Sequence, residues 1–82
     1  MNTKIIKAVA DATRLKLLAK IGKGAICACA LPGYVNKSQP AVSQHLRILL
    51  DAGLVKVKKE GVRRVYSLSQ KGAAVLEDIS RW

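Results

Sequence analysis

The sequence predicts a mainly α-helical fold with one β-hairpin, and three observations support this prediction. Apolar residues recur at helical spacing up to about residue 52, alternate with charged residues over residues 54–59, and return to helical spacing after Ser69. The 82 residues are too few for two independent cores. We therefore expect a single domain that spans residues 1–82.

Two short helices are predicted at the start of the chain. Residues 4–9 place apolar side chains on one stripe, and Asp11 is positioned to cap a second helix over residues 12–21. The apolar face of this second helix is expected to comprise Leu15, Leu18 and Ile21.

A third and a fourth helix follow. The third is a short piece over residues 25–31, which should end where Pro32 and Gly33 interrupt the helical pattern. After a turn, the fourth helix begins behind Ser38 and continues to about residue 52, where Gly53 is placed to end it.

The fourth helix has two distinct faces when its residues are spaced at about 100 degrees each. The arc that must face the core holds Val42, Leu46, Leu49 and Leu50. The opposite arc holds Pro40, Gln44, Arg47, Ile48 and Asp51. One side of this helix is therefore predicted to be free for a partner.

The hairpin is predicted from two strands, residues 54–59 and 62–68, that turn at Glu60 and Gly61. With a two-residue turn, the expected cross-strand pairs are Lys58 with Arg63 and Val55 with Tyr66. A last helix, capped by Ser69 and ending at Trp82, completes the chain. Its apolar residues are Ala73, Val75, Leu76 and Ile79.

The charge of the chain points to a polyanionic partner. Fifteen basic residues oppose five acidic ones, which gives a net charge of +10. Nucleic acid is favoured over an anionic membrane surface or mere solubility. Because the start lacks a secretory apolar region and no long apolar stretch occurs, we expect a soluble cytoplasmic protein that neither enters a membrane nor needs a disulfide framework.

The segment SQPAVSQHLRILLDAGLV favours a helix that enters the major groove of double-stranded DNA. Small polar residues in its first turns allow close approach, and amide and guanidinium groups hydrogen-bond to base edges. An ordinary amphipathic helix would share this pattern, but the preceding short helix and the following basic hairpin favour the DNA-binding interpretation. The order of elements predicts a winged helix-turn-helix.

At this point the sequence resembles the ArsR/SmtB family of winged-helix metalloregulators over nearly its whole length. The resemblance rests on ADATRLKLL, ICACAL, SQPAVSQHLRILLDAGLV and KKEGVRRVYSLS. It implies a homodimeric transcriptional repressor that binds operator DNA and releases it when a metal or metalloid binds. The positions implied to contact bases are Ser38, Gln39, Pro40, Ala41, Ser43 and Gln44, with Arg47 near the DNA backbone.

The basic residues of the hairpin are expected to contact phosphates, with a solvated tip as the alternative. These residues are Lys58, Lys59, Arg63 and Arg64. For His45 we favour a structural, hydrogen-bonded role over a contact with DNA, and we do not expect it to bind a metal. Trp82 and the last helix are expected to join the first helix in the dimer surface, with simple core cover as the alternative.

The residues leave three interpretations of Cys27 and Cys29 open: small buried apolar side chains, ligands of a soft ion, or a sensor of oxidation. The resemblance implies trivalent arsenic or antimony, or a soft divalent metal such as cadmium, as an inducer and not as an obligatory cofactor. Pro32 stands where the family has a third thiolate. Because residues two apart on an α-helix point about 200 degrees apart, one ion could bind both sulfurs only if the helix start unwound.

An enzyme is not expected, and neither is a small organic substrate. One histidine and five acidic residues form no nucleophile with a base, no paired carboxylates and no open metal site. Three aromatic residues are too few for the stacking platform of an RNA-binding module. A non-specific architectural DNA-binding protein, or a constitutive winged-helix protein, remains the main alternative to a repressor.

Overall fold

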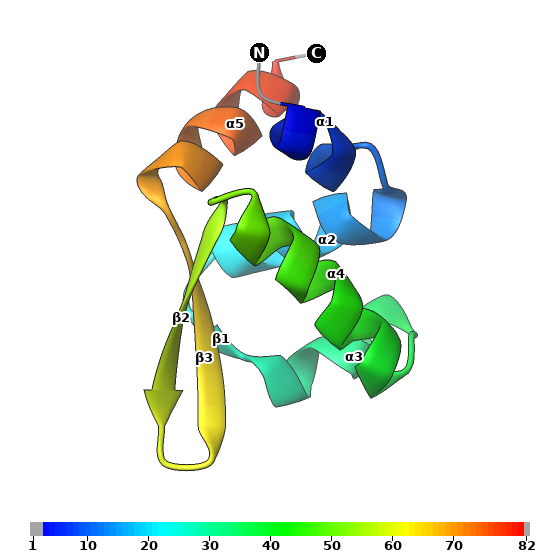
Figure 1. Ribbon diagram of the computed structural model, residues 1–82, viewed down its shortest axis with the longest axis vertical. Coiled ribbons are helices and arrows are strands. Elements are labelled where there is room, and N and C mark those ends of the chain that lie inside the picture. Colours follow the sequence, from blue (N-terminus) through cyan, green and yellow to red (C-terminus); the bar gives the residue numbers. More distant parts are fainter. Residues whose placement is uncertain (1–2, 82) are drawn as a thin grey trace.

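The computed structural model describes residues 3–81 and places a three-stranded antiparallel sheet beside a bundle of helices (Figure 1). In chain order the elements are α1 (Thr3–Val9), α2 (Ala12–Gly22), β1 (Ile26–Cys27), a 3₁₀ turn η1 (Ala28–Ala30), α3 (Leu31–Val35), α4 (Gln39–Asp51), β2 (Val55–Glu60), β3 (Arg63–Leu68) and α5 (Gln70–Ser80). The predicted fold class, mainly α with a β-hairpin, is confirmed.

Three helices begin at side-chain caps, of which those at Asp11 and Ser69 were predicted from the sequence. The Asp11 carboxylate accepts a hydrogen bond from the backbone N–H of Arg14 at 3.0 Å, at the start of α2. The hydroxyls of Ser38 and Ser69 accept from the backbone three residues on, at 3.3 Å and 2.9 Å, at the starts of α4 and α5. Each such cap stabilises its helix by about 1 kcal/mol, because it satisfies an N–H that has no partner within the helix.

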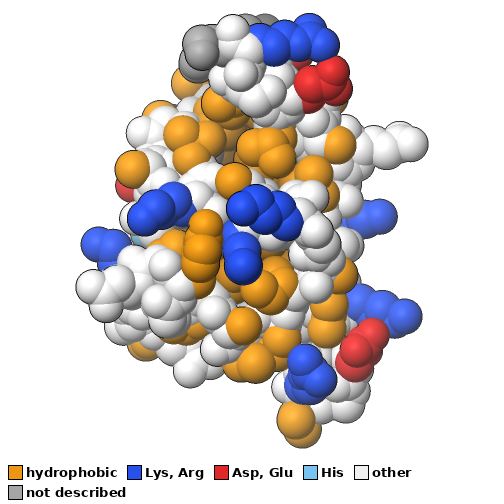
Figure 2. All heavy atoms as spheres, turned by 180° about the vertical axis from the view of Figure 1, so that it is seen from behind, with side chains coloured by type: hydrophobic (Ala, Val, Ile, Leu, Met, Phe, Trp, Pro, Cys, Tyr) orange, Lys and Arg blue, Asp and Glu red, His pale blue; other side chains and the backbone are white. Residues whose placement is uncertain are grey.

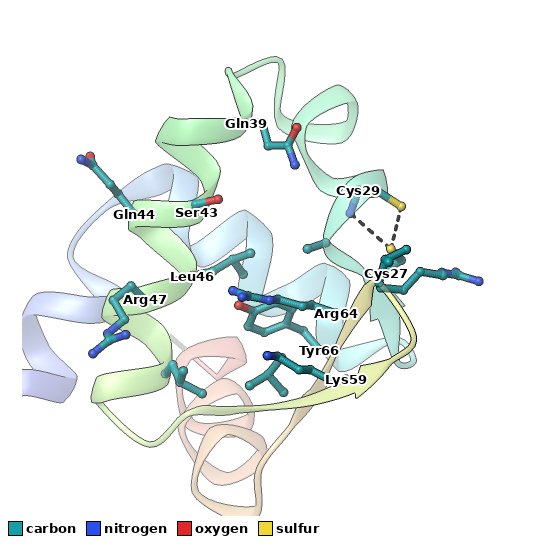
Figure 3. A pocket seen from close by; sticks show the side chains of 15 residues that line it. Cys27, Cys29, Gln39, Ser43, Gln44, Leu46, Arg47, Lys59, Arg64 and Tyr66 are labelled. Atoms are coloured by element: carbon teal, nitrogen blue, oxygen red, sulfur yellow. Dashed lines mark hydrogen bonds between the residues drawn. The ribbon is translucent and has the colours of Figure 1, made fainter.

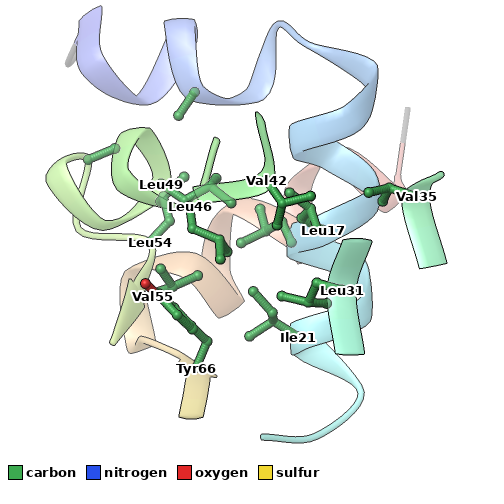
Figure 4. Close-up of a cluster of buried hydrophobic side chains, with 13 residues drawn as sticks. Leu17, Ile21, Leu31, Val35, Val42, Leu46, Leu49, Leu54, Val55 and Tyr66 are labelled. Carbon is green, nitrogen blue, oxygen red and sulfur yellow. The ribbon is translucent and has the colours of Figure 1, made fainter. Parts of the chain in front are cut away.

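The hydrophobic core lies between α2, α3, α4 and the sheet (Figure 4). On α4 the prediction is confirmed, since Val42, Leu46 and Leu49 are buried and Leu50 is half-buried. On α2 the buried residues are Leu17, Leu18 and Ile21, whereas Leu15 is only half-buried. Helix α2 contacts α1, α3, α4, α5 and β3, so its buried stripe is wider than the predicted one and includes Leu17.

The prediction of a helix over residues 25–31 that ends at Pro32 is wrong. Ile26 and Cys27 form a short strand, β1, that pairs antiparallel with β3. Pro32 lies in the first turn of α3, where its missing N–H costs nothing and its fixed φ suits the helix. Helix α3 ends instead at Asn36, which adopts the left-handed conformation with φ of 55°.

The predicted register of the hairpin is also wrong, because the turn lies one residue further on. Glu60 pairs with Arg63, and the two central turn residues are Gly61 and Val62. Gly61 has φ of +64°, which matches a type II′ turn with glycine in the first central position. Consequently Lys58 lies opposite Val65, Val55 opposite Leu68 and Val57 opposite Tyr66.

Helices α1 and α5 lie at the end of the molecule away from the hairpin tip (Figure 1). The start of α5 is held against residues 53 and 54, because the Ser69 hydroxyl donates to the carbonyl of Gly53 at 2.6 Å and the Ser69 N–H to that of Leu54 at 3.1 Å. Trp82 lies outside the described residues. Over residues 3–81, no helix is both long and apolar enough to cross a bilayer.

Candidate nucleic-acid interface and thiol pair

The exposed face of α4 carries the polar residues that the sequence assigned to base contacts. Ser38, Gln39, Pro40, Ser43, Gln44 and Arg47 are exposed, and Ala41 is half-buried. Figure 3 shows Gln44 and Arg47 pointing away from the body of the protein. Arg47 forms an exposed ion pair with Asp51 one turn later, with Nε 3.1 Å from the carboxylate, and such a pair is weak enough to be exchanged for a phosphate.

The four basic residues of the hairpin divide between its two faces. Lys59 lies opposite Arg64, and both are on the face that also holds Tyr66 and turns toward α4. Lys58 and Arg63 lie on the other face, because successive residues of a strand point to opposite faces of the sheet. The like-charged cross-strand pair is therefore Lys59 with Arg64, and not Lys58 with Arg63 as predicted.

Helix α4 and the hairpin enclose a cleft of about 880 Å³ (Figure 3). Its apolar lining includes Leu46, Leu50, Val57 and Tyr66. Basic residues on its walls are Arg47, Lys59, Arg63 and Arg64. Cys27 and Cys29 border the same cleft, so the structure brings the thiols together with the groups predicted to bind DNA.

The two thiols lie on the same side of the chain. The Sγ atoms of Cys27 and Cys29 are 2.6 Å apart, and the backbone N–H of Cys29 donates to Sγ of Cys27 at 3.4 Å. The strand and the 3₁₀ turn bring the sulfurs together, whereas an α-helix would have pointed them apart. The prediction that one ion could bind both sulfurs only after a helix unwinds is therefore wrong.

The environment activates one of the two thiols. Hydrogen bonds from the Cys29 side chain and backbone, together with the Arg63 guanidinium, lower the pKa of Cys27 to about 7. The same shared hydrogen bond raises the pKa of Cys29, with burial and the neighbouring negative charge acting in the same direction. Cys27 is 9% exposed and Cys29 is exposed, so the pair combines a shielded thiolate with an accessible thiol.

Arg14 is a structural residue that the sequence analysis missed. Its Nε and Nη2 donate to the carbonyls of Ala8 and Lys7, each at 3.0 Å, and its Nη1 lies 3.1 Å from Nδ1 of His45. A basic residue in the first turn of a helix opposes the helix dipole, and this was the available signal that Arg14 has another partner. The structural, hydrogen-bonded role predicted for His45 is confirmed.

A short helix, a second helix with a free polar face and a basic hairpin beside it define a winged helix-turn-helix DNA-binding protein. The sequence profile of the arsR family of bacterial regulatory proteins matches residues 11–57. The arsenical resistance operon repressor of Staphylococcus aureus is 37% identical over 75 residues, which are 92% of this chain and 69% of the repressor.

Solved structures agree with this assignment. NolR from Sinorhizobium fredii superposes with a TM-score of 0.86 at 30% identity, over 96% of this chain and 80% of NolR. A homodimeric winged helix-turn-helix DNA-binding domain from Mycobacterium bovis, described as a possible ArsR-family regulator, has a TM-score of 0.83 at 25% identity, over 96% of this chain and 73% of that one. The chain belongs to the arsR family of bacterial transcription regulators. The family comprises regulatory proteins, and relatives such as those of Staphylococcus aureus and Staphylococcus xylosus are named as repressors, so the expectation that the protein is not an enzyme is confirmed.

Proposed function

We propose that this regulator binds an operator as a homodimer and that a thiol-binding metalloid or metal at Cys27 and Cys29 releases it. The observation that carries the proposal is the shared cleft: the polar face of α4, the basic face of the hairpin and both thiols border it. A ligand on the thiols therefore acts within the surface that contacts DNA.

Within the major groove, the first turns of α4 supply the contacts to base edges. Gln39 and Gln44 carry side-chain amides, which can form two hydrogen bonds with an adenine. The small side chains of the first turns let the helix approach the bases closely; they belong to Ser38, Pro40, Ala41 and Ser43. Phosphates are bound by Arg47, Lys58, Lys59, Arg63 and Arg64. A phosphate between Lys59 and Arg64 also relieves the repulsion of two cations that lie directly opposite each other.

Dimerisation is supported by the apolar residues at the α1 and α5 end. Ile6 on α1 is 46% exposed, and Val75, Leu76 and Ile79 on α5 are only half-buried. Figure 2 shows hydrophobic side chains, in orange, gathered on the rear face between the basic residues and toward this end. With two recognition helices about 34 Å apart, the operator is an imperfect inverted repeat.

Release is supported by the position of β1. Cys27 pairs with Val65 in β3, two residues from the basic residue Arg63. A ligand that re-orients Cys27 disturbs this pairing and with it the hairpin, so the liganded protein fits DNA less well. The difference in DNA affinity between the two forms is the coupling free energy. The Staphylococcus aureus relative is named for arsenical resistance, so arsenite is the first inducer to test.

A second candidate is release by oxidation. It is favoured by one observation, a Cys27 thiol with a pKa of about 7 beside an accessible second thiol. A peroxide would oxidise Cys27 to a sulfenic acid, and the Cys29 thiol would then displace water to form a disulfide.

A footprint on the DNA upstream of the protein's own gene tests these proposals together. We expect an inverted repeat to be protected even when competitor DNA is present. This protection should be lost when arsenite or cadmium is added. The Cys27→Ser, Cys29→Ser double variant should bind the same site and no longer respond. If the protein binds the upstream DNA no better than competitor DNA, and no specific site is protected, it is instead an architectural protein. If protection is lost only when peroxide is added, the protein is the oxidation sensor.

A further inference from the structure

We infer that the cleft between α4 and the hairpin binds a small organic acid, with the carboxylate at Lys59, Arg64 and Tyr66 and the apolar body against α4. The acid and DNA then exclude each other. This exclusion rests on the proposed function, in which Lys59 and Arg64 contact phosphates, whereas binding of the acid to the free protein does not. Three observations support the inference: the walls of the cleft, two unpaired cations and one tyrosine hydroxyl.

The cleft has the size and the apolar walls of a small-molecule site. Its volume is about 880 Å³, and such sites generally enclose about 300–1,000 Å³. Val57 and Tyr66 lie directly opposite each other on the hairpin and form one wall, and Leu46 and Leu50 on α4 form the other. Because Val57 is 40% exposed, this wall leaves apolar surface in water that a ligand could cover.

Two cations lie beside the apolar wall with no anion between them. Lys59 and Arg64 are cross-strand partners two residues along from Val57 and Tyr66, so all four side chains share one face of the hairpin. Over residues 3–81, neither Lys59 nor Arg64 forms an ion pair. Glu60, the acidic residue of the hairpin, lies on the opposite face. Like charges placed directly opposite each other are destabilising, so an anion between them is attracted by both.

The Tyr66 hydroxyl adds a hydrogen-bond donor at the same place. Tyr66 is only 8% exposed, yet its hydroxyl has no hydrogen-bond partner in the part of the chain that the structure describes. Buried tyrosine hydroxyls usually have one. The oxygen is open to the cleft and not sealed in the core, so a ligand can reach it. Figure 3 shows this hydroxyl and the Arg64 guanidinium together, facing α4.

These groups together define the class of the ligand. A carboxylate accepts hydrogen bonds from a guanidinium, an ammonium and a phenol at once through its several lone pairs. An apolar body attached to it covers Val57, which is two strand residues or about 7 Å further in. A free phosphate would leave the apolar walls in water, and an uncharged hydrocarbon would leave the cations and the phenol unpaired. The site therefore favours an acid with an apolar body over either.

The test measures binding of acetate, butyrate, hexanoate and octanoate to the reduced full chain by isothermal titration calorimetry. We expect one octanoate per chain, and about two- to fourfold tighter binding for each added methylene that is buried against the apolar walls. Octanol has an apolar body of the same length and no charge, and it should bind at least about tenfold more weakly than octanoate. Inorganic phosphate should not displace octanoate at equal concentration.

Four variants separate the parts of the site. Tyr66→Phe should weaken octanoate about threefold or more and leave the free energy of unfolding nearly unchanged, because the hydroxyl bonds to nothing in the fold. Arg64→Gln should weaken all the acids alike, and Val57→Ser should weaken octanoate and not acetate. Lys56→Gln is the matched control, because it removes the same charge from an exposed position on the opposite face of β2, and octanoate binding should not change.

Equal affinity for acetate and octanoate, or an equal loss in Lys56→Gln and Arg64→Gln, would overturn the inference, since charge alone would then explain binding. Octanoate should also displace a labelled duplex of the upstream DNA, and acetate at the same concentration should not. If octanoate binds as expected and the duplex stays bound, the acid site stands, and the exclusion and the phosphate role of Lys59 and Arg64 fall. If duplex binding depends on Lys59 and Arg64 and no acid binds, the proposed function stands and this inference falls.

Discussion

Arg14 donates a hydrogen bond from Nη1 to Nδ1 of His45, 3.1 Å away, and so joins α2 to α4. The same guanidinium donates to the carbonyls of Lys7 and Ala8 at the end of α1. Because a guanidinium has no acceptor, Nδ1 of His45 accepts and Nε2 carries the ring proton. One side chain thus holds α1, α2 and α4, the helix proposed to contact DNA, together.

Replacing Arg14 by lysine should therefore lower both stability and specificity. The planar guanidinium directs separate N–H groups to three acceptors, and the single ammonium group of lysine cannot contact all three. We therefore expect the free energy of unfolding, measured with urea, to fall by about 1–3 kcal/mol. Affinity for the operator should fall more than affinity for random DNA, because the bases are contacted only when α4 is correctly oriented. Lys16→Gln, at an exposed position on α2, is the matched control, and His45→Asn should retain more function than His45→Leu.

Gly72→Ala should destabilise the fold, although alanine favours helices by about 1 kcal/mol over glycine. A Cβ at this position would meet the carbonyl oxygen and the carbonyl carbon of Leu54, against which α5 begins. Relief of this overlap requires α5 to move, at a cost of about 1–3 kcal/mol. Gly33→Ala on α3 is the control, because its Cβ would meet nothing within 4 Å. Thermal unfolding should show a lower Tm for the first variant and an equal or higher Tm for the second.

Alkylation of Cys27 should follow a pH profile with its midpoint near 7. The folded protein lowers the pKa of this thiol from 9.0 to about 7, so the thiolate is present above pH 7 and is lost as the pH falls below it. Folding is correspondingly favoured by deprotonation of Cys27 above that pH, and acidification removes the contribution. Iodoacetamide rates in Cys29→Ala should still show a lowered midpoint, held now by the backbone N–H of residue 29 and by Arg63, and closer to 9. Arg63→Gln should also raise the midpoint in the wild-type background, and Arg64→Gln should not.

Arg64→Gln should reduce the salt dependence of DNA binding. If Arg64 neutralises one phosphate in each subunit, the slope of log K against log salt should become less steep by about 0.9 per subunit. Operator and random DNA should be affected alike, because a phosphate contact carries no sequence information. Glu60→Gln in the same hairpin should leave the slope unchanged or make it steeper. An unaltered slope in Arg64→Gln would remove this residue from the phosphate contacts.

Gln44→Ala should change the sequence preference of DNA binding and not its salt dependence. Loss of a paired contact with a base should cost about 1–3 kcal/mol at one operator position and relax the preference there, with the salt slope unchanged. A set of operators with single base changes, measured by fluorescence anisotropy, identifies the position. Asp51→Asn, which removes the partner of Arg47 on the same helix, is the comparison, and it should not change base preference.

Local interactions made much of this protein predictable from its sequence. The caps at Asp11, Ser38 and Ser69, and the buried and free faces of α4, depend on residues within a few positions of one another. The helical period then fixes which α4 side chains can reach a partner. For this reason the candidate DNA-contacting surface could be drawn from residues alone.

The tertiary structure decided what depends on distant parts of the chain. Strand β1 has two residues and no period of its own, and it exists because β3, almost forty residues later, offers it hydrogen bonds. That pairing replaces the predicted helix and brings the sulfurs of Cys27 and Cys29 to one side. The bond between Arg14 and His45 likewise joins residues 31 positions apart. Such contacts leave no mark on local spacing, because their free energy is gained only when the whole core has formed.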